Sequence, residues 1–298
     1  MILSLTKTIW MFYIGFGIFC GIATGLAYQS MLSFLHALPL KQSGIVDGAV
    51  LCGFALSGTI CGSFINILNV YLSWRLTLLI ACTCSIILVL LTGVLMAFHN
   101  HTVIQKNAAF VWGGDMLRSR SFLFFISWSI IIGSFAMGHL SNASSILYHN
   151  KMPFIAYIPL TLPLCNALGR FLYTLSSAFL SLKRFIKIVN VGMMISLLSF
   201  SLFLLTEEDL FYILSAILSL LNFGCITAML PQCIEYLYGS LYFPIHYAIC
   251  NLQALITSTI GPLLLLFFIH SFSSCIMLLI LCFSFYSIGK KLIVYFRS

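Results

Sequence analysis

Long apolar segments fill most of this 298-residue sequence, and they restrict what the chain can fold into. Residues 9–35, for example, contain no charged side chain. A helix needs about 20 mostly apolar residues to cross the hydrocarbon core of a bilayer, and helices satisfy their own backbone hydrogen bonds there. Charged residues make up 7% of the chain, against about 25% in a soluble domain. We therefore predict an all-α integral membrane protein whose main partner is the lipid bilayer.

Polar and turn-forming stretches divide the chain into about nine predicted transmembrane helices. Their approximate ranges are 9–35, 45–69, 75–98, 121–148, 154–180, 186–206, 210–235, 244–269 and 272–293. The longest polar stretch predicts three parts: a partial N-terminal lobe of three helices (1–98), a central loop (99–120) and a C-terminal lobe of six helices (121–298).

The basic residues of the loops predict the orientation, because cytoplasmic loops carry an excess of Lys and Arg. Ten of them fall on one side: Lys41, Lys106, Arg118, Arg120, Lys183, Arg184, Lys187, Lys290, Lys291 and Arg297. The opposite side has three: Lys7, Arg75 and Lys151. We therefore predict a cytoplasmic central loop and a cytoplasmic C-terminus, in a membrane that the sequence does not specify. Because the basic residues lie in these loops, the net charge of +8 does not indicate a protein that binds nucleic acid.

Glycines recur at every fourth position of the first predicted helix, at Gly17, Gly21 and Gly25, and again at Gly58 and Gly62 in the second. Small residues on one face let a neighbouring backbone approach closely. We predict that these five glycines pack against other helices. A second interpretation is that helix faces without side chains let the helices rock against one another during alternating access.

Short motifs follow one another in a particular order along the chain. They include residues 21–28 (GIATGLAY), 53–58 (GFALSG), 74–75 (WR), 117–122 (LRSRSF), 166–170 (NALGR), 230–231 (LP) and 261–262 (GP). The series resembles the major facilitator superfamily, and within it the oxalate/formate antiporter and monocarboxylate transporter branch. On this resemblance the nine helices correspond to the family's helices four to twelve, and the first three have no counterpart.

The resemblance implies a major facilitator-type helical bundle, N-terminally incomplete, that transports a small organic anion by alternating access. One cationic site residue fits a monocarboxylate better than a dianion, with or without a coupled proton. The missing helices leave an alternative open. The chain is then truncated or degenerate, transports nothing, and acts as a membrane-embedded binding or scaffold partner.

Arg170 is the most informative candidate site residue, because it is a permanent charge inside a predicted transmembrane helix. Such a charge costs at least about 2.5–3.5 kcal/mol near the bilayer centre, and guanidinium is suited to gripping a carboxylate. In the resembled branch an arginine at this place binds the substrate anion. The alternative is an internal salt bridge or a contact with a backbone carbonyl.

Four further residues are candidates for lining the substrate site. Asn251 and Gln253 could hydrogen-bond a substrate, or bond between helices instead. His139 could couple a proton, because histidine titrates near neutral pH, or make a buried polar contact. Tyr28 could line the cavity or pack as an aromatic side chain. We expect no cofactor, no metal site and no enzyme activity, because the sequence contains no nucleophile, zinc or phosphate-binding motif.

Overall fold

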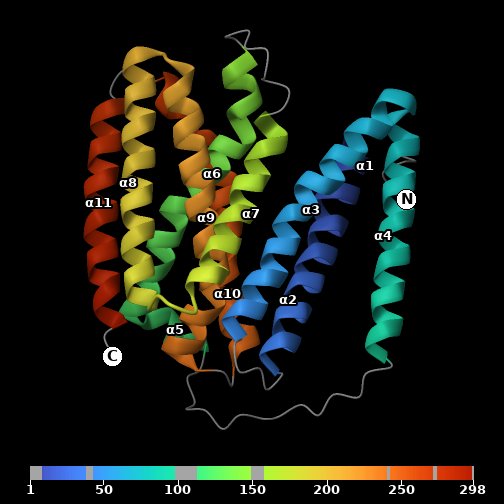
Figure 1. The fold of residues 1–298 in the computed structure, drawn as a ribbon, viewed down its shortest axis with the longest axis horizontal. Helices are drawn as coiled ribbons and strands as arrows, with labels where there is room; N and C mark the ends of the chain where they lie inside the picture. Colours follow the sequence, from blue (N-terminus) through green and yellow to red (C-terminus); the bar gives the residue numbers. More distant parts are fainter. Residues whose placement is uncertain are drawn as a thin grey trace. The chain divides into compact units, whose positions relative to one another are not determined.

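The computed structural model describes residues 9–37, 43–97, 113–148, 158–239, 242–270 and 274–296, and their regular elements are helices (Figure 1). Its contacts divide the chain into two compact units. The first comprises Met1–Leu40 and Ile60–Gln105, and the second comprises Lys41–Thr59 and Lys106–Ser298.

The described part of the first unit contains two long helical segments and a shorter one, residues 60–71, all with mostly exposed apolar side chains. The elements α1 (Ile9–Phe12), η2 (Tyr13–Cys20) and α2 (Gly21–Ala37) follow one another without a break in helical backbone geometry. The middle element is a π-helix of 8 residues, although π-helical stretches are usually single turns. The second segment is α4 (Trp74–Ala97). Exposed apolar side chains such as Trp10, at 73%, suit a surface that faces lipid.

The second unit is a bundle in which α6 and α9 are central. Its elements are the first part of α3 (Ser43–Tyr71), then α5 (Gly113–Arg118), α6 (Arg120–Tyr148), α7 (Ile158–Ser176), α8 (Leu182–Thr206), α9 (Asp209–Tyr238), α10 (Phe243–His270) and α11 (Ser274–Tyr295). Helix α6 packs on α9, α10 and α11, while α9 packs on α6, α7 and α8. Helix α11 also packs on α8 and so covers the side of the bundle opposite α7 (Figure 1).

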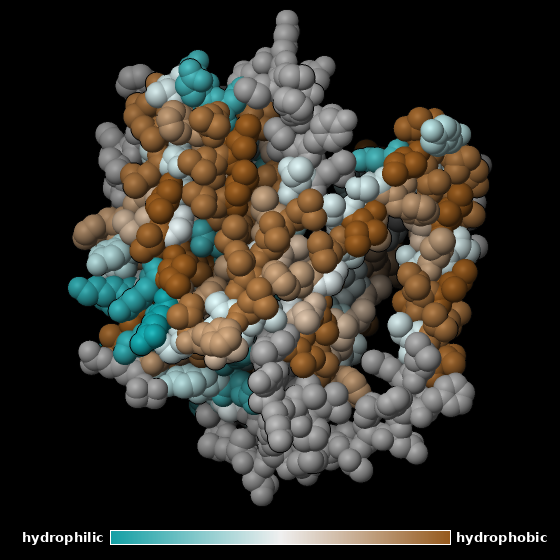
Figure 2. All heavy atoms as spheres, in the orientation of Figure 1, coloured by the Kyte–Doolittle hydropathy of each residue, from teal (hydrophilic) through white to brown (hydrophobic). Residues whose placement is uncertain are grey.

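The described residues confirm the prediction of an all-helical protein with several membrane spans. Seven helices are long and apolar enough to cross a bilayer, in the ranges Ile9–Leu32, Gly48–Tyr71, Trp74–Val94, Arg120–Leu147, Leu182–Thr206, Asp209–Tyr238 and Phe243–Ile269. The predicted fifth and ninth spans are also helical, as α7 and α11, but they are not among these seven. Figure 2 shows apolar side chains over most of the visible face of the described helices.

Glycines bring two pairs of helices in the second unit into very close contact. A Cβ added to Gly169 of α7 would collide with the Leu221 carbonyl of α9, and one added to Gly224 of α9 would collide with the Asn166 carbonyl of α7. Helices α6 and α10 meet in the same way at Gly261, where a Cβ would meet the Ser134 backbone. Close backbone contact of this kind is how small residues drive helix association in lipid.

Buried polar side chains add hydrogen bonds between helices. The Trp128 indole N–H of α6 donates to Asn190 Oδ1 of α8 at 2.7 Å. Ser196 of α8 and Ser215 of α9 each donate to the other's backbone carbonyl at 2.8 Å. Such interhelical bonds are worth about 0.6 kcal/mol each on average in a membrane, with a maximum near 1.7. They tie α6, α8 and α9 into one unit.

Candidate functional site

Helix α7 carries Arg170 in its second half. The residue lies 12 positions after Ile158 and 6 before Ser176. At 1.5 Å per residue these separations are about 18 Å and about 9 Å. Polar and helix-bending residues, among them Pro163 and Asn166, lower the apolar character of this 19-residue helix. One face of the helix, with Arg170 and Tyr173, is buried, and the other exposes apolar side chains such as Leu168 and Leu175.

The Arg170 side chain is buried, with 5% of it exposed, and it reaches the neighbouring helix α3. Its Nη1 donates a hydrogen bond to the Leu51 backbone carbonyl at 2.7 Å. The guanidinium carbon also lies over the Phe54 ring, 5.7 Å from the ring centroid. Cation–π contacts of this length are worth about 0.5–1 kcal/mol, and more when desolvated. The carbonyl contact weighed for Arg170 in the sequence analysis is therefore present.

Three contacts show that α3 and α7 run in opposite directions. A Cβ at Gly48 would overlap the Thr174 side chain, and one at Gly58 would lie 3.8 Å from Pro163 Cβ. Between these two ends, Cys52 Sγ lies 3.5 Å from the Ala167 carbonyl, as a weak donor to it. As the residue number rises along α3 it falls along α7, so the two helices are antiparallel. Arg170 lies among these contacts, which we call the α3–α7 seam.

The seam joins parts of the chain that the sequence analysis assigned to different lobes. Residues 41–59 form one compact unit with residues 106–298. They had been placed in the predicted N-terminal lobe of residues 1–98, whereas α7 had been placed in the C-terminal one. The lobes themselves stay a prediction, but the Arg170 contact connects sequence from both of them.

His139 of α6 lies in an aromatic cage and is fully buried. Its Nε2 is 3.1 Å from Ser215 Oγ, and the rings of Phe135, Phe200 and Tyr212 surround the imidazole at centroid distances of 4.7 to 5.4 Å. Its Nδ1 has no hydrogen-bond partner among the described residues. This is the buried polar contact weighed as the alternative, and proton coupling stays a prediction.

The remaining candidate residues lie on other helices. Gln253 of α10 is buried, and its Oε1 accepts no hydrogen bond from the described part of the chain. Asn251, on the same helix, is half-buried. Tyr28 is half-buried on α2, in the first unit. A common site formed by these residues and Arg170 stays a prediction.

The predicted packing glycines are less crowded than those of the second unit. A Cβ on Gly17, Gly21 or Gly25 would meet nothing within 4 Å among the described atoms, and Gly58 makes only the ordinary contact with Pro163. Packing at these positions, and at Gly62, stays a prediction.

Sequence reasoning missed the α3 partners of Arg170. Leu51 contributes its backbone carbonyl, so its side chain carried no signal. Phe54 lies in the 53–58 motif, but nothing in that motif indicated that its ring would lie under a guanidinium.

Comparison with known proteins leaves the family open. The chain matches no protein-family model, and it matches no curated protein. The major facilitator resemblance therefore stays a prediction, and the statement that holds is that this is a multi-span helical membrane protein.

Proposed function

We propose that this protein is a secondary carrier for a small organic anion, with Arg170 as the group that binds the carboxylate. The observation that carries the proposal is a permanent cation at 5% exposure in the seam between two helices. Bundle-core positions between helices or repeats are where transporters bind their substrates. Charged residues at such positions commonly belong to substrate or ion pathways.

The contacts of Arg170 with α3 are of a kind that a carboxylate can replace. A backbone carbonyl and an aromatic ring are neutral partners. Hydrogen bonds to a carboxylate are charge-assisted, roughly twice as strong as neutral ones, and frequently bidentate with arginine. In this proposal an anion reaches Arg170 when α3 and α7 separate, and the contact with Leu51 closes the seam again.

Uptake by proteoliposomes tests the proposal. The full chain is reconstituted and loaded with buffer, and the entry of labelled formate, acetate and lactate is followed over time. We expect saturable uptake that falls at least tenfold in Arg170→Leu and in Arg170→Lys. The lysine variant keeps the charge but loses the planar fork that holds a carboxylate by two bonds.

Arg184→Leu is the matched control, because Arg184 is an exposed arginine at the start of α8. It should transport like the wild type. Thermal unfolding of each variant in detergent separates loss of binding from loss of folding. Wild-type uptake retained by a folded Arg170→Leu variant would refute the role of Arg170.

A second candidate function is a non-transporting membrane protein in which Arg170 only ties α3 to α7. The bond to the Leu51 carbonyl favours it, because a structural arginine needs such a contact. On this candidate no tested anion enters the liposomes. Arg170→Leu then lowers the unfolding temperature, and no carboxylate changes that temperature in the wild type.

A further inference from the structure

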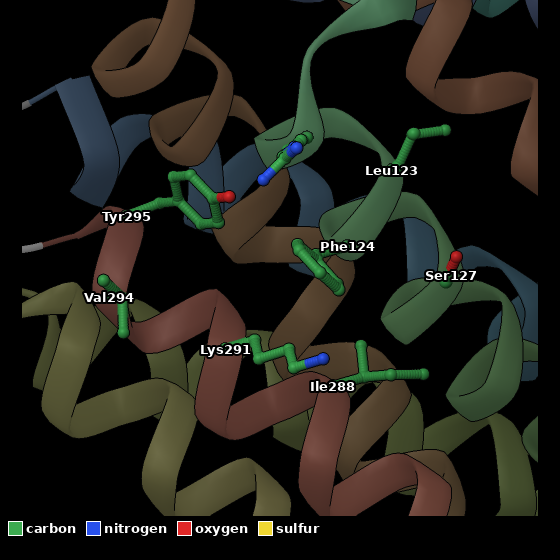
Figure 3. A pocket seen from close by; sticks show the side chains of 8 residues that line it. Leu123, Phe124, Ser127, Ile288, Lys291, Val294 and Tyr295 are labelled. Atoms are coloured by element: carbon green, nitrogen blue, oxygen red, sulfur yellow. The ribbon is translucent and has the colours of Figure 1, made fainter.

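A cavity of about 600 Å³ lies between α6 and α11, away from Arg170. Figure 3 shows Leu123, Phe124 and Ser127 of α6 on one side, with Ile288, Lys291, Val294 and Tyr295 of α11 on the other. Arg120, the first residue of α6, completes the lining. The cavity is therefore at the end of the bundle where α6 begins and α11 ends.

Among the described residues, two cations and no acidic side chain line this cavity. Arg120 and Lys291 are both exposed. The Lys291 ammonium lies 5.6 Å from the centroid of the Phe124 ring, and that ring packs against Tyr295 at 6.1 Å. An anionic group with several oxygen atoms, such as a phosphate, complements this pair of charges. Basic pockets between transmembrane helices are a recurrent way of binding anionic lipid headgroups.

Apart from the hydroxyl groups of Ser127 and Tyr295, the rest of the lining is apolar, which does not suit a fully hydrated anion. Leu123 and Val294 are 52% and 53% exposed, and Ile288 lies beside them in the cavity wall. A soluble phosphate compound would leave these side chains facing water. A molecule with a charged head and an apolar body would cover both kinds of surface.

A second, mostly apolar cavity of about 110 Å³ lies farther along α6, and residues of α10 form about half of its lining. Its α6 residues include Ile130, Ile131 and Ser134, which follow Ser127 at spacings of three, four and seven and so lie on one helix face. On α11 it is lined by Leu281, two turns from Ile288. The separation of Ser127 and Ser134 along the helix is about 10 Å. The two cavities thus follow one another along α6 and form one seam, with a basic end between α6 and α11 and an apolar end lined mainly by α6 and α10.

We propose that this seam binds one anionic phospholipid. The phosphate lies between Arg120 and Lys291, and an acyl chain runs past Ile288 toward the second cavity. The combination of paired cations, apolar walls and an apolar continuation into the bundle selects a lipid over a free phosphate. The site involves different helices from the Arg170 seam, and its occupancy does not depend on transport.

Lipid binding to the purified chain tests this proposal. The protein in detergent is titrated with phosphatidylglycerol, phosphatidylcholine or glycerol 3-phosphate, and binding is read by native mass spectrometry and by thermal unfolding. We expect phosphatidylglycerol to bind at least fivefold more tightly than phosphatidylcholine, and glycerol 3-phosphate to have no effect. The Arg120→Gln/Lys291→Gln variant should lose that preference.

Two further variants make the result specific. The pair Arg184→Gln/Lys187→Gln removes two exposed charges from α8 and should keep the wild-type preference. Ile288→Trp fills the apolar wall without changing charge and should weaken phosphatidylglycerol binding. Equal binding of the two lipids, an unchanged preference in the Arg120/Lys291 variant, or binding of glycerol 3-phosphate as tight as that of the lipid would overturn the proposal.

Discussion

The contact between α7 and α9 predicts a large cost for adding a single methyl group. In Gly224→Ala the new Cβ would meet the Asn166 backbone carbonyl, with the carbonyl carbon and Asn166 Oδ1 both at 3.0 Å. A backbone group cannot rotate away, so the helices must move apart along their whole contact. Overpacking typically costs about 1–3 kcal/mol, occasionally more. An alanine in a helix otherwise gains about 0.5–1 kcal/mol over glycine.

The expected net loss is therefore up to about 2.5 kcal/mol, which corresponds to a fall of up to about 10 °C in unfolding temperature. Gly53→Ala in α3 is the matched control, because a Cβ there meets nothing within 4 Å. It should leave the unfolding temperature unchanged or raise it slightly. The assay is thermal unfolding of purified protein in one detergent, followed by the fluorescence of a thiol-reactive dye. Equal unfolding temperatures for the two variants would show that α7 and α9 are not packed at Gly224.

Three other changes test the buried polar contacts of the second unit by the same assay. Trp128→Phe should lower the unfolding temperature, because it leaves Asn190 Oδ1 buried without its donor. The double mutant Trp128→Phe/Asn190→Leu should recover part of that loss. Fully additive effects of the two substitutions on stability would contradict the hydrogen bond. Ser196→Ala and Ser215→Ala should each cost about 0.6 kcal/mol, with clear coupling in the double mutant. Asn142→Ala should also lower the unfolding temperature, because the Asn142 amide of α6 donates a hydrogen bond to the Pro262 carbonyl of α10 at 3.1 Å. An unchanged unfolding temperature would contradict this contact between α6 and α10.

The helices of this protein were predictable because one physical requirement dominates the sequence. Long uncharged apolar runs have to pair their backbone groups internally in lipid, and the predicted ranges match the described helices to within a few residues for α6, α9 and α10. Helix α7 is less predictable from hydropathy than the other helices of the bundle. Arg170 and Asn166 make it less apolar than a free-standing span, and its place in the bundle follows from contacts with α3 and α9 rather than from hydropathy.

The close contacts between helices could not be predicted from glycine spacing. The regular series at Gly17, Gly21 and Gly25 has no described neighbour within 4 Å, whereas Gly169 and Gly224, which lie on different helices, are tightly enclosed. Whether a glycine is needed depends on which backbone lies opposite, and a single sequence does not contain that information.

Arg170 itself was predictable, but its environment was not. A charge in an apolar run is visible in the sequence because its cost is high. Its partner on α3 is a backbone carbonyl, which every residue has. The basic residues Arg120 and Lys291 were noticed only as signals of orientation, and their common cavity required the packing of α6 against α11.

The antiparallel contact of α3 with α7 is central to this account, and disulfide formation measures it directly. Cys52 Sγ lies 3.5 Å from the Ala167 carbonyl oxygen. A cysteine introduced by Ala167→Cys should therefore form a disulfide with Cys52 under mild oxidation. A protease site inserted after residue 101 then distinguishes the outcomes on a non-reducing gel. We predict that the cleaved, oxidised Ala167→Cys protein stays as one band and that the Cys52→Ser/Ala167→Cys control separates into two fragments. Two fragments from both proteins would contradict the α3–α7 seam and, with it, the placement of Arg170.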